Sequence, residues 1–337
     1  MTGWTATSAA ARLGRAVGIR ARWTTSYAAA HAAGRAARGH RSQGDTIFAR
    51  GLVRNRARAS AADAKALDVA LAAMVTDRQV IERAVAAGAP LTAIAALTSA
   101  WARLPEDVRD VVRSPGGNGP GTVILGNVPA TQVDQTTCGA AVMAMMLMMG
   151  DPLVAAWVMT SRSFGDYLPP EVVGIDGEMR TVEQRWHGLQ RALHRAVTRR
   201  GLGVAPWPQS LGTPPWGVAR VARFGGVAFR SVVLDDAHAG TVTAAVAHAA
   251  AALRDGIPVP LYTSGDSHLG LATVVPRHVV LLVGRTDGGF LVYEPGTGRV
   301  VPLAEARLYG PGPREAAYGN WTRATWLILP RPKKSAP

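Results

Sequence analysis

The chain has 337 residues, enough for one large domain with a smaller one beside it. Its formal net charge is +14, and only three of its 37 basic residues are lysines. Because it has a single cysteine, an internal disulfide is excluded and a reducing compartment is allowed. No cofactor is expected, because the sequence lacks a P-loop, a dinucleotide fingerprint and any ligand spacing typical of zinc or calcium.

Positive charge is concentrated in residues 1–60, where eleven arginines stand against one acid, Asp45. This composition predicts a flexible basic segment or Ala-rich helices with solvated arginines. The alternative is contact with an anionic partner: a nucleic acid, a membrane surface or an acidic protein. The first 40 residues lack the continuous apolar stretch of a signal peptide, so a cytoplasmic location is expected.

Residues 61–113 predict a region of short helices. A capping box at Thr76–Gln79 precedes an apolar pattern, and Pro90 and Pro105 are placed to begin two further helices. Residues 114–121 are rich in Pro and Gly and predict a linker, at which we place a domain boundary.

The second predicted domain spans residues 122–330, and residues 331–337 form a polar tail. Helices precede an antiparallel sheet in this part, an order that indicates an α+β fold. The best membrane-span candidate, residues 140–159, is broken by Gly150-Asp151-Pro152, so no integral span is expected. A capping box at Thr181–Gln184 predicts a helix start. The helices are expected at 140–149, 182–197 and 241–255, and the strands at 123–125, 227–234, 257–263, 277–284, 289–294, 299–302 and 322–329.

Cys138 follows a polar loop and precedes an apolar run. This pattern places the thiol in the first turn of a buried helix, where unpaired backbone N–H groups favour a thiolate. Far downstream, His278 begins one predicted strand and Glu294 ends the next. A cysteine, a histidine and a carboxylate in these positions are typical of a nucleophile, a base and the acid that orients the base.

These motifs resemble those of papain-like cysteine peptidases, in particular the bacteriocin-processing (double-glycine leader) peptidases and their stand-alone relatives. In that family a glutamine six residues before the nucleophile helps to form the oxyanion hole, and Gln132 has this spacing. The family's cysteine is followed by glycine, as Cys138 is by Gly139. Its histidine opens a strand of the form H-x-V-x-x-x-G, which residues 278–284 match.

The resemblance implies a papain-like fold with a Cys138–His278–Glu294 triad, Gln132 in the oxyanion hole and a peptide or protein substrate. It is carried by motifs at the two ends of residues 120–305. In two places the chain departs from the family. Glu294 replaces the aspartate that usually stands before proline, and Thr137 stands where many members carry aspartate.

A hairpin register predicts that His278 meets Glu294. If residues 279–283 pair with 289–293 through a five-residue loop, 284–288, these side chains stand directly opposite on one face. Their Cβ atoms would then be about 4.5–5.5 Å apart, whereas a one-residue slip would separate them. Glutamate is longer than aspartate by roughly 1.5 Å, which a small backbone offset or a water molecule would absorb.

Each site residue also has an ordinary structural explanation. A lone cysteine is usually a small buried hydrophobe, and a strand histidine is usually a satisfied core residue. His268 is the main rival base, His248 is expected to be a surface or packing residue, and His187 and His194 are expected to be solvated. The chain is thus predicted to be a cysteine peptidase. A transglutaminase-like or amide-forming enzyme and a catalytically silent peptide-binding module remain alternatives.

Overall fold

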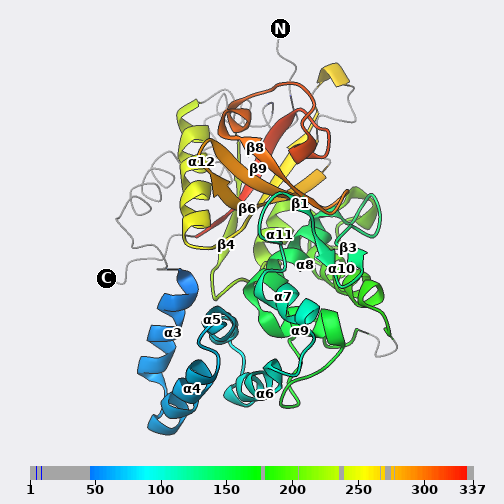
Figure 1. Ribbon diagram of the computed structural model, residues 1–337. Helices are drawn as coiled ribbons and strands as arrows, with labels where there is room; N and C mark the ends of the chain where they lie inside the picture. Colours follow the sequence, from blue (N-terminus) through cyan, green and yellow to red (C-terminus); the bar gives the residue numbers. More distant parts are fainter. Residues whose placement is uncertain are drawn as a thin grey trace.

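The computed structural model describes residues 46–175, 179–203, 205–234, 239–265, 267–269, 275–276 and 278–331, together with Thr5 and Ala9. Most of the predicted basic segment and nearly all of the polar tail therefore lie outside the described residues. The described part is an α+β fold, as the order of the sequence elements predicts: helices pack against a seven-stranded antiparallel sheet (Figure 1).

The N-terminal helices gather in the lower part of the molecule (Figure 1). The capping box predicted at Thr76 is wrong, because the N-cap of the helix that begins at Arg78 is Asp77, and Asp77 makes no capping hydrogen bond. Its carboxylate instead accepts hydrogen bonds from Arg113 and Trp101, so a tertiary ion pair replaces the local cap. The five helices are α3 (Ile47–Arg58), α4 (Ala61–Ala73), α5 (Arg78–Ala87), α6 (Leu91–Trp101) and α7 (Glu106–Arg113).

Residues 114–121 connect these helices to the sheet, and Gly117 turns there with a φ of 76°. Two helices that follow this segment in the chain pack against the N-terminal helices. Helices α5 and α7 lie against α9 (Pro152–Thr160), and α5 also contacts α8 (Cys138–Gly150). The guanidinium of Arg83 donates to the carbonyls of Met149 and Val112 and so joins three of these helices.

The main sheet has the strand order β1-β8-β7-β6-β5-β9-β4. Helices α8 and α12 (Ala239–Arg254) both contact its strand β6. Between them in the chain come α10 (Val182–Thr198), where the predicted capping box of Thr181 and Gln184 is confirmed, and α11 (Pro215–Val221). The strands are β1 (Gly121–Thr122), β4 (Phe229–Val233), β5 (Val259–Ser264), β6 (His278–Thr286), β7 (Gly289–Glu294), β8 (Arg299–Ala304) and β9 (Arg323–Pro330), and β2 (Ile124–Leu125) and β3 (Val128–Pro129) form a separate pair.

Helix α8 is almost wholly buried, as the apolar run after Cys138 predicts. Among the described residues, no single helix is long and apolar enough to cross a membrane. Helices α8 and α9 reach the required length and composition only as a pair, and that pair is bent by 112°.

The predicted hairpin register is wrong in its details. Strands β6 and β7 are joined by the two-residue turn Asp287-Gly288, and Leu281 pairs with Tyr293. The Asp-Gly pair suits such a short turn, so β6 continues to Thr286, and a bulge at Val283 shifts the pairing. Continued along the strands, this register sets Glu294 two residues away from the position opposite His278. A shift of two residues keeps both side chains on the same face.

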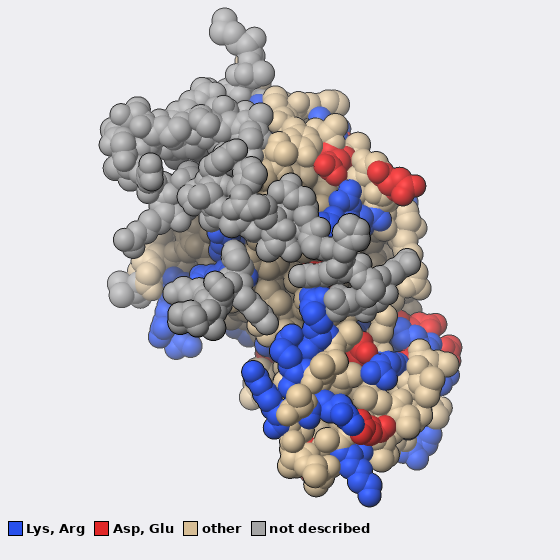
Figure 2. Space-filling model, turned by 90° about the vertical axis from the view of Figure 1, so that its left-hand side faces the viewer, with Lys and Arg blue, Asp and Glu red and all other residues tan. Residues whose placement is uncertain are grey.

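Lys and Arg side chains gather over the helical part of the molecule on the side that shows α3 (Figure 2). Arg54 and Arg58 of α3 and Lys65 of α4 are exposed, whereas Arg56 is paired with Asp68 at 2.7 Å. This surface includes the described end of the predicted basic segment. An anionic partner for it stays a prediction.

Candidate active site

Cys138 is the first residue of α8 and is 4 % exposed. The residue before it, Thr137, makes no capping hydrogen bond to the helix. Its hydroxyl accepts from the Asp134 backbone N–H at 2.9 Å and lies 3.0 Å from the Asp134 carbonyl. The side chain of Thr137 thus leaves the backbone N–H groups in the first turn of α8 uncapped. The sulfur of Cys138 lies in the electrostatic field of these N–H groups.

Gly139 allows another segment to come against this first turn. A Cβ atom at Gly139 would lie 1.9 Å from Thr213 Oγ1 and 3.3 Å from a methyl group of Val279. Tyr262 secures the approaching segment, because its hydroxyl donates to the Thr213 carbonyl at 2.9 Å. Burial raises the pKa of Tyr262, and the charge of Cys138 adds to the effect.

His278 stands between the thiol and the acid. Its Nε2 lies 2.7 Å from Glu294 Oε1, and Cys138 is near enough to the ring to act on its pKa. Burial by itself lowers the pKa of His278, but the hydrogen bonds to Cys138 and Glu294 and the charges of both outweigh it and raise the pKa to about 9. The imidazolium is therefore the favoured form at neutral pH.

Glu294 is buried, and every contact of its carboxylate is with a donor. Oε1 accepts from His278 and from the Gly296 N–H at 2.8 Å, and Oε2 accepts from the Thr297 N–H and hydroxyl at 2.8 and 2.7 Å. Although burial raises the pKa of Glu294, the bonds from His278, Thr297 and Gly296 lower it below the ordinary value. Glu294 is thus a fully hydrogen-bonded acid, and its side chain reaches His278 although the hairpin register does not place the two residues directly opposite each other.

Gly319 packs against the imidazole of His278. It has a φ of 64°, and a Cβ atom there would lie 2.4 Å from Cδ2 of the ring. Any other residue at this position would both strain the backbone and push the ring. Sequence reasoning missed Gly319, because nothing local to it signals a contact with a residue 41 positions earlier.

Gln132 lies in the loop before α8. Its backbone N–H donates to the Pro295 carbonyl at 2.8 Å, which ties the loop to the turn after Glu294. Its side-chain amide donates to the Asp134 carbonyl at 2.8 Å, and Oε1 is buried with no partner. A hydrogen bond joins His278 to Glu294 and Cys138 acts on the same imidazole, whereas the Gln132 amide is bound within its own loop.

Helix α10 and strand β7 hold this loop in place. The Thr131 carbonyl accepts from Trp186 Nε1 at 2.7 Å and from Gln190 at 3.0 Å, and Gln190 accepts in turn from the Val133 N–H at 3.1 Å. The Tyr293 hydroxyl donates to the Ala130 carbonyl. From the sequence, Trp186 is recognisable as part of an apolar stripe, but its polar contact is not.

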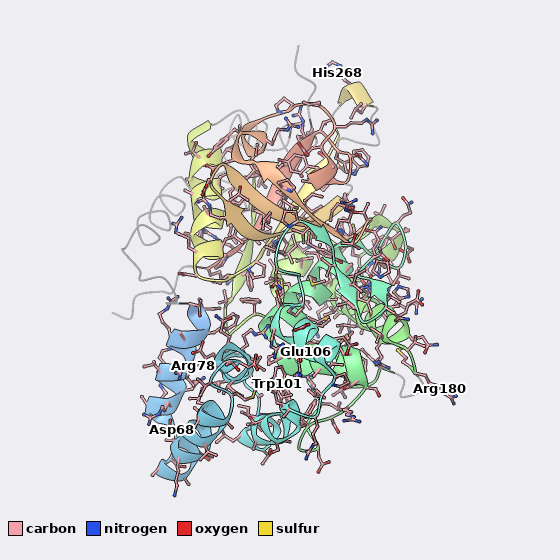
Figure 3. The ribbon with its side chains drawn as sticks, in the orientation of Figure 1. Asp68, Arg78, Trp101, Glu106, Arg180 and His268 are labelled. Atoms are coloured by element: carbon pink, nitrogen blue, oxygen red, sulfur yellow. The ribbon has the colours of Figure 1, made fainter. Side chains whose placement is uncertain are left out.

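The other histidines that the structure describes have different surroundings. His268 is exposed on a short 3₁₀ helix at the top of Figure 3, and His278 is the one that contacts Glu294. The prediction that His194 is solvated is wrong: it is 5 % exposed, and burial lowers its pKa. His248 is a packing residue, and burial together with the charge of Arg230 lowers its pKa to about 4. Among the described residues, no group of three or more His, Cys, Asp and Glu side chains is arranged to hold a metal ion.

The chain matches no protein-family model, and no similarity to a curated protein or to a solved structure was found.

Proposed function

We propose that the protein is a cysteine peptidase with a papain-like catalytic domain. The observation that carries the proposal is the chain of contacts from Cys138 through His278 to Glu294, with 2.7 Å between Nε2 and Oε1. A thiol at a helix start, a histidine bonded to it and a satisfied carboxylate behind the histidine are a nucleophile, a base and an orienting acid. The peptide or isopeptide bond of a protein or peptide is the proposed substrate.

In the proposed resting state the thiol proton lies on His278. The Cys138 sulfur attacks the carbonyl carbon, and the resulting oxyanion accepts from the backbone N–H of Cys138. His278 gives its proton to the leaving amine, the C–N bond breaks and a thioester remains. His278 then takes a proton from water, the hydroxide attacks the thioester, and the acid product leaves with the proton returned to the site.

Glu294 keeps the imidazole oriented during both steps. Because Glu294 is an ionised acceptor, the proton at Nε2 of His278 points toward it, which leaves Nδ1 for the sulfur. Gln132 is the second oxyanion donor in this proposal. Its amide would have to leave the Asp134 carbonyl and turn toward the substrate.

The test is product analysis by mass spectrometry with the full chain and a mixture of peptides. Wild-type protein is expected to generate new peptide termini, and Cys138→Ala is expected to abolish them while the circular dichroism spectrum stays native. His268→Ala is the matched control for His278→Ala and should keep wild-type turnover. Transfer of the acyl group to an added amine in preference to water would indicate an acyltransferase, and full turnover in Cys138→Ala would end the cysteine-enzyme proposal.

A further inference from the structure

Gln190, a fully buried residue of α10, bonds the backbone on both sides of Gln132. Its Nε2 donates to the Thr131 carbonyl at 3.0 Å, and its Oε1 accepts from the Val133 N–H at 3.1 Å. Because a carbonyl can only accept and a backbone N–H can only donate, these two partners fix the orientation of the carboxamide. Both ends of this side chain are therefore used to hold one loop.

The backbone of Gln132 itself is also held. Its N–H donates at 2.8 Å to the carbonyl of Pro295, in the turn that follows Glu294. The Thr131 carbonyl accepts a second hydrogen bond, from Trp186 Nε1 at 2.7 Å. Hydrogen bonds from two elements thus fix the backbone at residues 131, 132 and 133, and the side chain of Gln132 is the part of this loop that can turn.

That side chain is only half satisfied where it lies. Its Nε2 donates to the Asp134 carbonyl at 2.8 Å, whereas its Oε1 is buried and has no partner. A buried acceptor without a donor is unfavourable. Turning the Gln132 amide away from Asp134 therefore breaks one hydrogen bond at Nε2 and none at Oε1.

An oxyanion is a better acceptor for this amide than the Asp134 carbonyl, because hydrogen bonds to ionised acceptors are stronger than those to neutral ones. The exchange of acceptor becomes favourable as charge develops on the substrate, so it stabilises the transition state more than the bound substrate. The gain depends on a loop that stays in place, since a misplacement of about 1 Å costs as much as about 10² in rate.

We propose that Gln190 is a positioning residue for the oxyanion hole. It holds Thr131 and Val133 in place, so that the Gln132 amide turns from Asp134 to the oxyanion while the loop stays still. Gln190 acts through Gln132 and does not itself bond the substrate. The inference rests on the proposed function, because it needs Cys138 to attack a carbonyl.

The test compares two reactions of the same thiol in the full chain. With p-nitrophenyl acetate, the Cys138 sulfur attacks the acetyl carbon, an oxyanion forms, the C–O bond breaks and p-nitrophenolate leaves an acetyl thioester behind. With iodoacetamide, the sulfur displaces iodide from carbon and no oxyanion forms. A defect in the oxyanion hole therefore slows acylation alone, whereas a general disturbance of the site slows both reactions.

Gln190→Met has a side chain of similar length without the two hydrogen bonds, and is expected to slow acylation at least about tenfold and leave alkylation unchanged. Gln132→Ala should slow acylation by about 10² to 10³. Because Gln190 acts through Gln132, adding Gln190→Met to Gln132→Ala should cause no further loss. Gln190→Asn is shorter by roughly 1.5 Å and cannot bond both residues, so it should slow acylation selectively even if Gln190→Met does not fold.

Gln184→Met is the matched control. It removes a carboxamide from the same helix that also bonds two backbone groups, the N–H groups of Arg180 and Thr181. Because these bonds cap α10 and do not reach the loop of Gln132, Gln184→Met should be acylated at the wild-type rate.

The outcomes separate this inference from the proposed function. Unchanged acylation in the Gln190 variants, equal slowing of acylation and alkylation, or a full further loss in the double variant would overturn the role of Gln190 and leave a cysteine enzyme standing. Normal acylation in Gln132→Ala would overturn the role of both glutamines. Release of p-nitrophenolate by Cys138→Ala at the wild-type rate would refute the proposed function, and the inference with it.

Discussion

Two buried cations lie at opposite ends of α8, and burial by itself lowers the pKa of both. At the N-terminal end, His278 bonds Glu294 and interacts with Cys138, and its pKa rises to about 9 although burial opposes this. At the C-terminal end, Arg83 bonds two carbonyls, and burial lowers its pKa to about 10 against the weaker effect of Asp151. A direct anionic partner therefore decides whether the pKa of a buried cation ends above or below its ordinary value.

The largest expected effect comes from removing that partner. Glu294→Gln replaces an ion that accepts four hydrogen bonds, so at least one donor loses its acceptor and the imidazolium loses its counter-charge. Turnover is expected to fall by about 10² to 10⁴. Because His278 and Glu294 are offset by two residues, Glu294→Asp should also lose activity, although less than Glu294→Gln.

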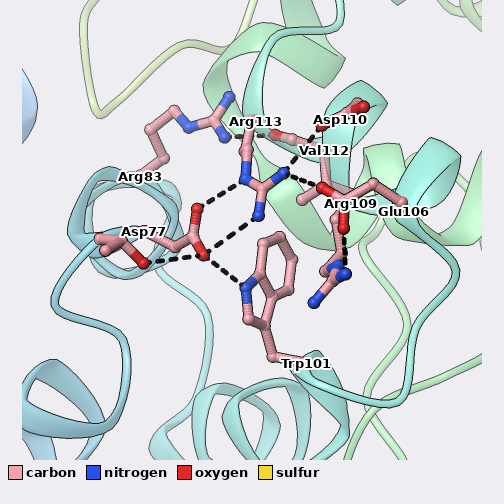
Figure 4. A network of polar contacts seen from close by, with 9 residues as sticks. Asp77, Arg83, Trp101, Glu106, Arg109, Asp110, Val112 and Arg113 are labelled. Atoms are coloured by element: carbon pink, nitrogen blue, oxygen red, sulfur yellow. Dashed lines mark hydrogen bonds and ion pairs between the residues drawn. The ribbon is translucent and has the colours of Figure 1, made fainter.

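Asp77→Asn is the control for Glu294→Gln. It makes the same carboxylate-to-amide change in the Arg113 network drawn in Figure 4, to which neither Cys138 nor His278 belongs. It should reduce the free energy of unfolding and leave turnover per folded molecule unchanged. Equal losses of turnover in the two variants would show that Glu294 has a structural role only.

The second effect is a dependence of stability on pH. The pKa of His278 is about 9 in the folded chain and about 6.5 in an unfolded one. The protonated ring therefore stabilises the fold fully below pH 6.5, and this contribution is lost as the pH rises toward 9. The shift corresponds to about 3 kcal/mol.

Urea unfolding of Cys138→Ala and of the double variant Cys138→Ala/His278→Gln at a series of pH values measures the part of this contribution that comes from Glu294, without a thiol that titrates over the same range. The stability advantage of the chain that keeps His278 should shrink, by less than about 3 kcal/mol, between pH 6 and pH 9.5. A stability advantage that stays constant over this range would contradict the raised pKa of His278.

The third and smallest effect is steric. Gly319→Ala places a methyl group 2.4 Å from the His278 ring and also forces alanine to a φ of 64°. Gly88→Ala is the matched control, because Gly88 has a φ of 83° and nothing within 4 Å of an added Cβ. Both should lose about 1–2 kcal/mol of unfolding free energy, but only Gly319→Ala should reduce turnover. Normal turnover in Gly319→Ala would show that His278 can shift freely.

The elements of this site are predictable from the sequence where one local pattern dominates. The apolar run after Cys138 predicts α8, and the Thr181 capping box predicts the start of α10. The hairpin register is not predictable from apolar alternation, because a bulge at Val283 changes it and the Asp287-Gly288 turn is two residues long. His278 and Glu294 nevertheless lie on the same face of the sheet, because the predicted register is wrong by two residues and side chains alternate between the faces with every residue.

The remaining errors arise from contacts between distant parts of the chain. Asp77 has an ideal position for a helix cap, but Arg113 and Trp101 compete for its carboxylate. His194 lies outside the apolar stripe of its helix, yet the segment around Gly212 covers it. No local pattern carries this information, since each partner comes from a different element.

The most direct test of the account is alkylation of Cys138 by iodoacetamide as a function of pH, in wild type and in His278→Ala. The label is unambiguous because the chain has one cysteine. An ordinary thiol, with a pKa of about 8.5, loses about tenfold in rate for each pH unit below that value. Wild type is predicted to keep most of its rate down to pH 6, whereas His278→Ala should follow the ordinary profile. Identical profiles for the two proteins would contradict the thiolate–imidazolium pair on which the proposed function rests.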